Sequence, residues 1–196
     1  MPNQYYSSNS KITGGAMFAS FNSKDGCVYI KLLKQIANNP SKVGNFDGKN
    51  PLNIKLGQDE VADIIRAVRT NGESKFYHKF DQTVTSGAFK YYTIKSTEPG
   101  KPDRQGFGIS VKRTGETSQE VKVGFTLGSA ERFSLWLQNA LVHIFDAEYS
   151  QDLKNYKDSQ DKKKPAKSAK SSPQQENLRK EEFPSETDNP EIGLDF

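Results

Sequence analysis

The chain has 196 residues, enough for one or two domains, and 11% of them are aromatic, which allows a hydrophobic core. Its mean hydropathy of −0.80 and its 27% of charged residues are too polar for one compact body, so we expect a folded region followed by a disordered appendage. The single cysteine, Cys27, excludes an internal disulfide, and no apolar run approaches the ~20 residues of a membrane span. The first six residues lack the basic and apolar segments of a secretory signal, so we expect a soluble intracellular protein.

Charge separates the chain near Ser150. Residues 1–150 carry 19 Lys and Arg against 14 Asp and Glu, a net charge of +5, whereas the remaining residues carry 9 against 10. Within this second segment the lysines gather first and the acids follow. We therefore predict a flexible N-terminus over 1–14, a folded domain over 15–150, a disordered Lys-rich linker over 151–175 and an acidic tail over 176–196.

The first half of the folded region predicts four strands and a helix. Runs rich in β-branched and aromatic residues indicate strands over 17–21, 27–36, 43–46 and 52–56. A helix follows Gly57, because Val61, Ile64, Ile65 and Val68 repeat at the spacing of one helical face. Asn71-Gly72 is a typical end for that helix.

The second half repeats this order. Strands are predicted over 75–80, 89–95, 107–113 and 121–127, with turns marked by Gly87, Pro99-Gly100 and Thr114-Gly115. Ser129 is the expected N-cap of a long helix that runs to about Ser150. The strand-to-helix joints Leu56–Glu60 and Leu127–Glu131 match at an offset of 71 residues. The layout therefore predicts an α+β fold of two ββββα units, residues 15–72 and 73–150.

The long second helix carries two apolar lines. A wide stripe is expected to pack on the sheets and consists of Phe133, Trp136, Leu137, Ala140, Leu141, Ile144 and Phe145. Leu135 and Val142, seven residues apart, lie on the opposite side of the helix. We expect this second line to pack within the chain, or alternatively to join a second subunit in a homodimer.

The order of elements resembles the Whirly and Pur-alpha-like superfamily, the positive-cofactor-four type of single-stranded nucleic-acid-binding fold. The resemblance covers about residues 15–150 and implies two curved antiparallel sheets, each backed by a helix. The lysine-glycine-lysine-alanine strand motif of the plant Whirly proteins is absent, so no contact residue is transferred from the family.

Lysines and arginines alternate with aromatic residues along the predicted strands. Single-strand binders need cations near the phosphates and flat rings that stack on bases. In the segment 75–80 the alternation places Lys75, Tyr77 and Lys79 on a binding face and the other three residues in the core. The candidate nucleic-acid contacts are Lys31, Lys55, Lys75, Tyr77, Lys79, Lys90, Tyr91, Tyr92, Lys95, Arg104, Lys112, Arg113 and Lys122. An ordinary solvated sheet surface would also carry lysines.

The C-terminal end is acidic and closes on an aromatic residue. Residues 176–196 hold seven acids against Arg179 and Lys180, a net charge of −5. This ending resembles the acidic, Phe-terminated tails of bacterial and phage single-stranded-DNA-binding proteins. The resemblance implies partner binding through Glu191, Ile192, Leu194, Asp195 and Phe196. The tail could also occupy the chain's own cationic groove, and an ordinary solvated tail is the alternative.

The sequence does not indicate an enzyme. His78, His143 and Cys27 lie in separate predicted elements without a catalytic or metal-binding motif around them, so we expect no cofactor and no metal. The leading hypothesis is a sequence-independent single-stranded-DNA-binding protein of DNA replication, recombination or repair. Its tail would recruit replication or recombination proteins in the cytoplasm of a bacterial or phage-infected cell. An RNA-binding protein, a transcription regulator of the same fold or a protein-interaction scaffold remain alternatives.

Overall fold

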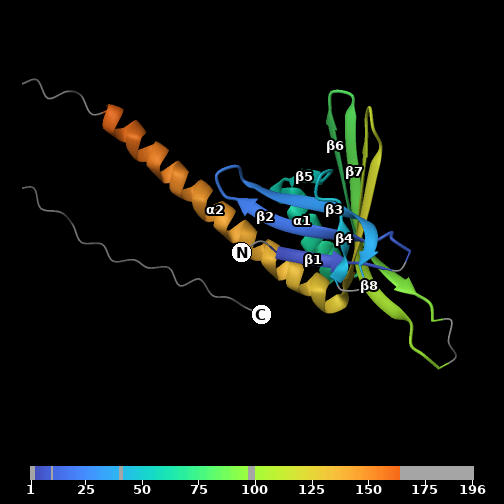
Figure 1. Cartoon of the computed structure of the whole chain (residues 1–196). Helices are drawn as coiled ribbons and strands as arrows, with labels where there is room; N and C mark the ends of the chain where they lie inside the picture. Colours follow the sequence, from blue (N-terminus) through green and yellow to red (C-terminus); the bar gives the residue numbers. More distant parts are fainter. Residues whose placement is uncertain (1–2, 10, 40–41, 97–99, 164–196) are drawn as a thin grey trace, which may run out of the picture.

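The computed structural model describes residues 3–9, 11–39, 42–96 and 100–163 (Figure 1). Over these ranges the chain forms nine strands and two helices, arranged as two antiparallel sheets. The strands of the first sheet run across those of the second, and the far end of the last helix projects away from both (Figure 1). No helix in the described ranges is long and apolar enough to span a membrane.

The first sheet contains the strands β1 to β5, and the helix α1 follows it. Their bounds are β1 Asn3–Ser7, β2 Gly15–Asn22, β3 Cys27–Asn39, β4 Lys42–Phe46, β5 Leu52–Leu56 and α1 Gln58–Arg69. The long β3 pairs with β2 on one side and with both β4 and β5 on the other. The four predicted strands and the predicted helix are therefore present.

The N-terminal strand β1 was not predicted, since the sequence indicated a flexible segment over 1–14. Tyr5 is only 5% exposed, and its ring centroid lies 5.0 Å from that of Phe125 and 5.5 Å from that of Phe133. One buried ring thus fixes a polar strand against the second sheet and α2 (Leu127–Lys163). The segment Asn3–Ser7 has no alternating pattern of apolar residues from which such a strand could be predicted.

The second sheet has the simple order β6-β7-β8-β9, with bounds β6 Glu73–Phe80, β7 Thr83–Ile94, β8 Arg104–Thr114 and β9 Gln119–Thr126. Gly87 lies inside β7 and is not a turn residue. A Cβ atom at Gly87 would lie 2.3 Å from Cζ of Phe76, so the glycine makes room for that ring. The turn before β7 uses Asp81, whose φ is 53°.

The helix α2 differs from its prediction at both ends. It begins at Leu127, and Oγ1 of Thr126 accepts a hydrogen bond from the backbone N–H of Ser129 at 3.2 Å. Thr126 therefore has the capping position that was predicted for Ser129. The helix continues to Lys163, so the prediction of a disordered linker from residue 151 was wrong for the segment 151–163. The rest of the predicted linker and the acidic tail lie outside the described residues.

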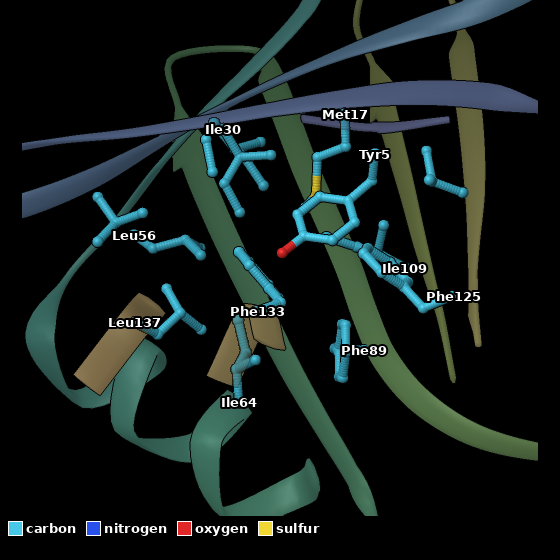
Figure 2. Close-up of a cluster of buried hydrophobic side chains, with 14 of the residues drawn as sticks. Tyr5, Met17, Ile30, Leu56, Ile64, Phe89, Ile109, Phe125, Phe133 and Leu137 are labelled. Atoms are coloured by element: carbon cyan, nitrogen blue, oxygen red, sulfur yellow. The ribbon is translucent and has the colours of Figure 1, made fainter. Parts of the chain in front are cut away.

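Both sheets and both helices share one core. Its fully buried side chains include Met17 and Ile30 of the first sheet, Phe89 of the second, Ile64 of α1 and Phe133 of α2, which converge in Figure 2. The two predicted ββββα units are therefore halves of a single packed body. The predicted fold class, two curved antiparallel sheets with helices, is confirmed.

Three predictions of buried apolar residues were wrong. Phe80 was placed in the core but is 84% exposed, because it lies at the end of β6 beyond the elements that cover the sheet. Leu135 and Val142 are 57% and 55% exposed, which contradicts their expected packing within the chain and does not bear on the alternative of a homodimer. Phe145 was assigned to the packed stripe of α2 and is 50% exposed.

Candidate nucleic-acid interface

The second sheet has one buried face and one open face. Phe89, Ile109 and Val123 are paired across neighbouring strands and point into the core. Because side chains alternate along a strand, the residues between them share the opposite side, which we call the outer face. In the observed register the outer face carries Lys75, Tyr77 and Lys79 of β6, Ser86, Ala88, Lys90 and Tyr92 of β7, Arg104, Gly106, Gly108, Ser110 and Lys112 of β8, and Glu120, Lys122 and Gly124 of β9.

The outer face is cationic. Its strands present the six positive side chains Lys75, Lys79, Lys90, Arg104, Lys112 and Lys122, and the acids within the same strands are Glu73 and Glu120. Within the described part of the chain, Lys79, Lys90 and Lys112 form no ion pair. Their charges are therefore available to phosphate groups.

Two open hollows lie side by side on the outer face. The first, about 490 Å³, lies between Tyr77 and Lys112. The second, about 320 Å³, lies beside Tyr92 and Lys122. Both volumes are in the range of small-molecule sites, about 300–1,000 Å³. Small side chains form the floors, and Ala88 and Ser110 belong to both hollows.

The ring of Tyr92 lies against a strip of glycines. A Cβ atom at Gly106 would lie 3.0 Å from Oη of Tyr92, and one at Gly124 would lie 3.4 Å from the same atom. A Cβ atom at Gly108 would lie 3.5 Å from Cε1 of Tyr92. Three glycines on two neighbouring strands thus seat this ring close to the backbone, which leaves the surface around it shallow.

Two acid–base pairs restrain lysines of this face. Nζ of Lys122 lies 2.9 Å from Oε1 of Glu120, and Oγ of Ser110 donates a hydrogen bond of 3.3 Å to the same carboxylate oxygen. The hydrogen bond from Lys122 lowers the pKa of Glu120 below its usual value. Nζ of Lys75 lies 3.3 Å from Oε2 of Glu73. Glu120 therefore holds a negative charge on the surface where phosphates would approach.

Eight of the thirteen candidate contacts lie together on the outer face: Lys75, Tyr77, Lys79, Lys90, Tyr92, Arg104, Lys112 and Lys122. Three others of the second sheet are separated from it. Tyr91 points inward, where its ring meets Phe107 edge to face at 5.4 Å. Arg113 donates hydrogen bonds to the backbone oxygen of Asn53 and to Oγ1 of Thr85, and so ties β8 to β5. Lys95 follows β7, and its Nζ lies 2.7 Å from Oδ2 of Asp103.

Lys31 and Lys55 lie on the first sheet, away from this cluster. Nζ of Lys55 is 6.0 Å from the ring centroid of Tyr29, its partner across the strand pair. The hydroxyl of Tyr29 donates a hydrogen bond of 2.9 Å to Asp25, and this bond raises the pKa of Tyr29.

Two features of the surface were not predicted from the sequence. The floor of small residues carries no chemical signal of its own, and only the register reveals that these residues are adjacent. A second aromatic cluster lies on the first sheet, where the ring of Tyr6 is 5.9 Å from Phe18 and 5.8 Å from Phe46. Tyr6 belongs to the strand that was not predicted, so this cluster could not be assembled from sequence.

The residues considered for catalysis have structural contacts. Nε2 of His78 lies 2.7 Å from Oε1 of Glu60, which links β6 to the start of α1. The ring of His143 stacks on Phe21, with centroids 5.7 Å apart. Cys27 is buried at the start of β3. In the described ranges no three His, Cys, Asp or Glu side chains gather as a metal site would require.

Solved structures that resemble this chain include two plant proteins. WHY1 from Arabidopsis thaliana superposes with a TM-score of 0.56 at 9% identity, over 80% of this chain and 92% of that one. WHY3 from the same plant superposes with a TM-score of 0.50 at 10% identity, over 78% of this chain and 92% of that one. At such identity the likeness concerns the fold, and the Whirly-like fold expected from the sequence is confirmed. No family model and no curated protein matches the chain.

Proposed function

We propose that the protein binds single-stranded DNA, with little dependence on sequence, on the outer face of its second sheet. The observation that carries this proposal is the arrangement of Tyr77 and Tyr92 beside two adjoining hollows among unpaired lysines. A nucleic-acid strand laid across β6 to β9 places its bases in the hollows and its phosphates near Lys79, Lys90 and Lys112. Stacking on a tyrosine contributes about 1–3 kcal/mol per base and accepts every base.

Single strands fit this surface better than a duplex does. The hollows are open and shallow, and a base reaches Tyr77 only with a free face. A duplex keeps both faces of its bases stacked and offers the protein only phosphates and groove edges. The face offers binding groups and no catalytic set, so we propose a binding protein and not an enzyme.

We propose further that this binding serves DNA replication, recombination or repair in the cytoplasm of a bacterial or phage-infected cell. The acidic segment 176–196 supports this role through its resemblance to the tails of bacterial and phage single-stranded-DNA-binding proteins, and its net charge of −5 is opposite to that of the outer face. The tail recruits replication or recombination proteins through its last residues and competes weakly for the outer face.

A competition experiment tests the binding proposal. Labelled single-stranded DNA bound to the full chain is displaced by unlabelled single-stranded DNA, duplex DNA and RNA at two salt concentrations. We expect single-stranded DNA to compete best and affinity to fall steeply with salt, because neutralised phosphates release counterions. If duplex DNA competes equally well, base stacking does not contribute to binding. If RNA competes better than single-stranded DNA, the protein is an RNA-binding protein.

Two truncations test the tail. Removing residues 176–196 should raise affinity for single-stranded DNA, most clearly at low salt where charges interact over longer distances. Removing Leu194, Asp195 and Phe196 alone should leave DNA affinity nearly unchanged and abolish binding of purified replication or recombination proteins. A Phe196→Ala chain that retains every such partner would show that the tail does not recruit them.

A further inference from the structure

The helix α2 carries an exposed apolar stripe that the DNA-binding proposal does not use. Its members are Leu135, Val142, Phe145, Tyr149, Leu153 and Tyr156, and each is between 42% and 66% exposed. At about 100° per residue they fall within one arc of roughly 80°. The buried residues of the same helix, such as Phe133, Leu137 and Ile144, lie on the other side. We call the six residues the outer stripe.

The second half of α2 stands beyond the body of the protein. Near the middle of α2, Nε2 of Gln58 donates a hydrogen bond of 2.5 Å to Oε1 of Glu148, and Gln151 and Asp152 line a hollow together with Ser23 and Lys24. From 148 to 160 every side chain is exposed, and the end of the helix stands clear of both sheets (Figure 1). A short helical segment without tertiary packing is only marginally stable in water. The extension therefore calls for a partner on its apolar side.

We propose that the outer stripe binds the same stripe of a second copy of this chain, in an antiparallel pair centred on Tyr149. Five of its residues, at 142, 145, 149, 153 and 156, are spaced by 3, 4, 4 and 3 residues. This spacing reads the same in both directions. A twofold axis at Tyr149 therefore places Val142 against Tyr156 and Phe145 against Leu153 of the other copy, so that all five residues find apolar partners.

The charges beside the outer stripe permit the antiparallel arrangement. Asp146 lies along one edge of the outer stripe with Lys157, and Asp152 lies along the other edge. In the antiparallel pair like edges meet, so Lys157 of one copy lies on the edge of Asp146 of the other. The two are five residues apart along the axis, or about 7.5 Å. A parallel pair joins opposite edges and places Lys157 five residues from Asp152 of the other copy, so the cross-linking experiment below distinguishes the two orientations.

The packing of each copy permits the pair. The body of each copy packs on the face of α2 that carries Phe133, Leu137 and Ile144, and it extends along the helix to the hollow lined by Gln151 and Asp152. In the antiparallel pair the two bodies therefore lie at opposite ends and on opposite sides of the paired helices. With aromatic side chains of about 150–250 Å² each, the exposed parts of the five paired residues amount to on the order of 500 Å² per copy. Flanking polar side chains bring this near the ~800 Å² per partner of a standard interface.

The experiment measures the mass of the full chain in solution without nucleic acid. We expect a species of twice the 21.9 kDa of one chain. Tyr149→Glu should give the monomer, because it places two carboxylates at the twofold axis. Asn155→Glu, which adds the same charge on the far side of the helix, should leave the dimer intact. A monomeric wild-type chain, or a Tyr149→Glu chain that dimerises as well as wild type, would overturn the proposal.

Cross-linking fixes the orientation. In a Cys27→Ser background, Val142→Cys and Tyr156→Cys chains are mixed and oxidised. The antiparallel pair predicts a disulfide between the two different variants and none within either variant alone. Disulfides within the Val142→Cys variant alone would indicate a parallel pair and contradict the proposal. Because both positions are more than half exposed, folding should be unaffected, and circular dichroism checks this directly.

Discussion

Replacing Tyr77 by alanine should weaken single-strand binding without unfolding the protein. Tyr77 is 63% exposed at the rim of the first hollow, so its ring contributes little to the core. Its loss removes one stacking contact, about 1–3 kcal/mol, which corresponds to a drop in affinity of about 5- to 150-fold. The free energy of unfolding should change by less than about 0.5 kcal/mol, as is usual at surface positions.

Phe80 provides the matched control for this prediction. It lies three residues further along β6, is 84% exposed and points to the other side of the sheet. Phe80→Ala therefore removes an exposed ring of similar size from the same strand without touching the outer face. Fluorescence anisotropy with a labelled thymine oligonucleotide measures affinity, and urea unfolding measures stability. If Tyr77→Ala binds as tightly as wild type, or if Phe80→Ala loses as much affinity, the outer face is not the stacking surface.

Three further changes test other parts of the account. Lys90→Ala and Lys112→Ala should each reduce the slope of log affinity against log salt concentration by about 0.7, the value for one phosphate contact on a single strand, and unchanged slopes would remove them from the interface. Glu120→Gln should raise affinity at low salt by about 1.5- to 5-fold, because an exposed ion pair of modest strength no longer holds Lys122 and one negative charge is lost. Tyr5→Ala should lower the free energy of unfolding by about 3–5 kcal/mol in urea titrations, since a buried ring is lost; a negligible change would mean that β1 is not part of the fold.

Alternation within single strands predicted part of the outer face. Along β6 the sequence placed Lys75, Tyr77 and Lys79 on the exposed side, and the structure agrees. Along β7 the segment around Tyr91 and Tyr92 offered a tyrosine and a lysine on both sides. Only the pairing with β6 and β8 decides that Tyr92 faces outward and Tyr91 inward. Register is a property of two strands and is not contained in either one.

Features that depend on distant contacts escaped prediction. The strand β1 exists because Tyr5 fits between Phe125 and Phe133, residues more than a hundred positions away. Conversely, the end of α2 was placed near Ser150 because its packed face stops there, yet the helix continues along a different apolar face. Leu135 and Val142 were predicted as a separate apolar line of α2 that packs within the chain. In the described structure both side chains are more than half exposed.

Photo-cross-linking locates the bound DNA strand on the protein. A thymine-rich oligonucleotide that carries photoreactive iodouracil is bound to the full chain, irradiated and digested, and the modified peptides are sequenced. Binding on the outer face of the second sheet predicts cross-links to Tyr77 and Tyr92. Cross-links confined to the cluster of Tyr6, Phe18 and Phe46 would place the DNA on the first sheet and contradict the account.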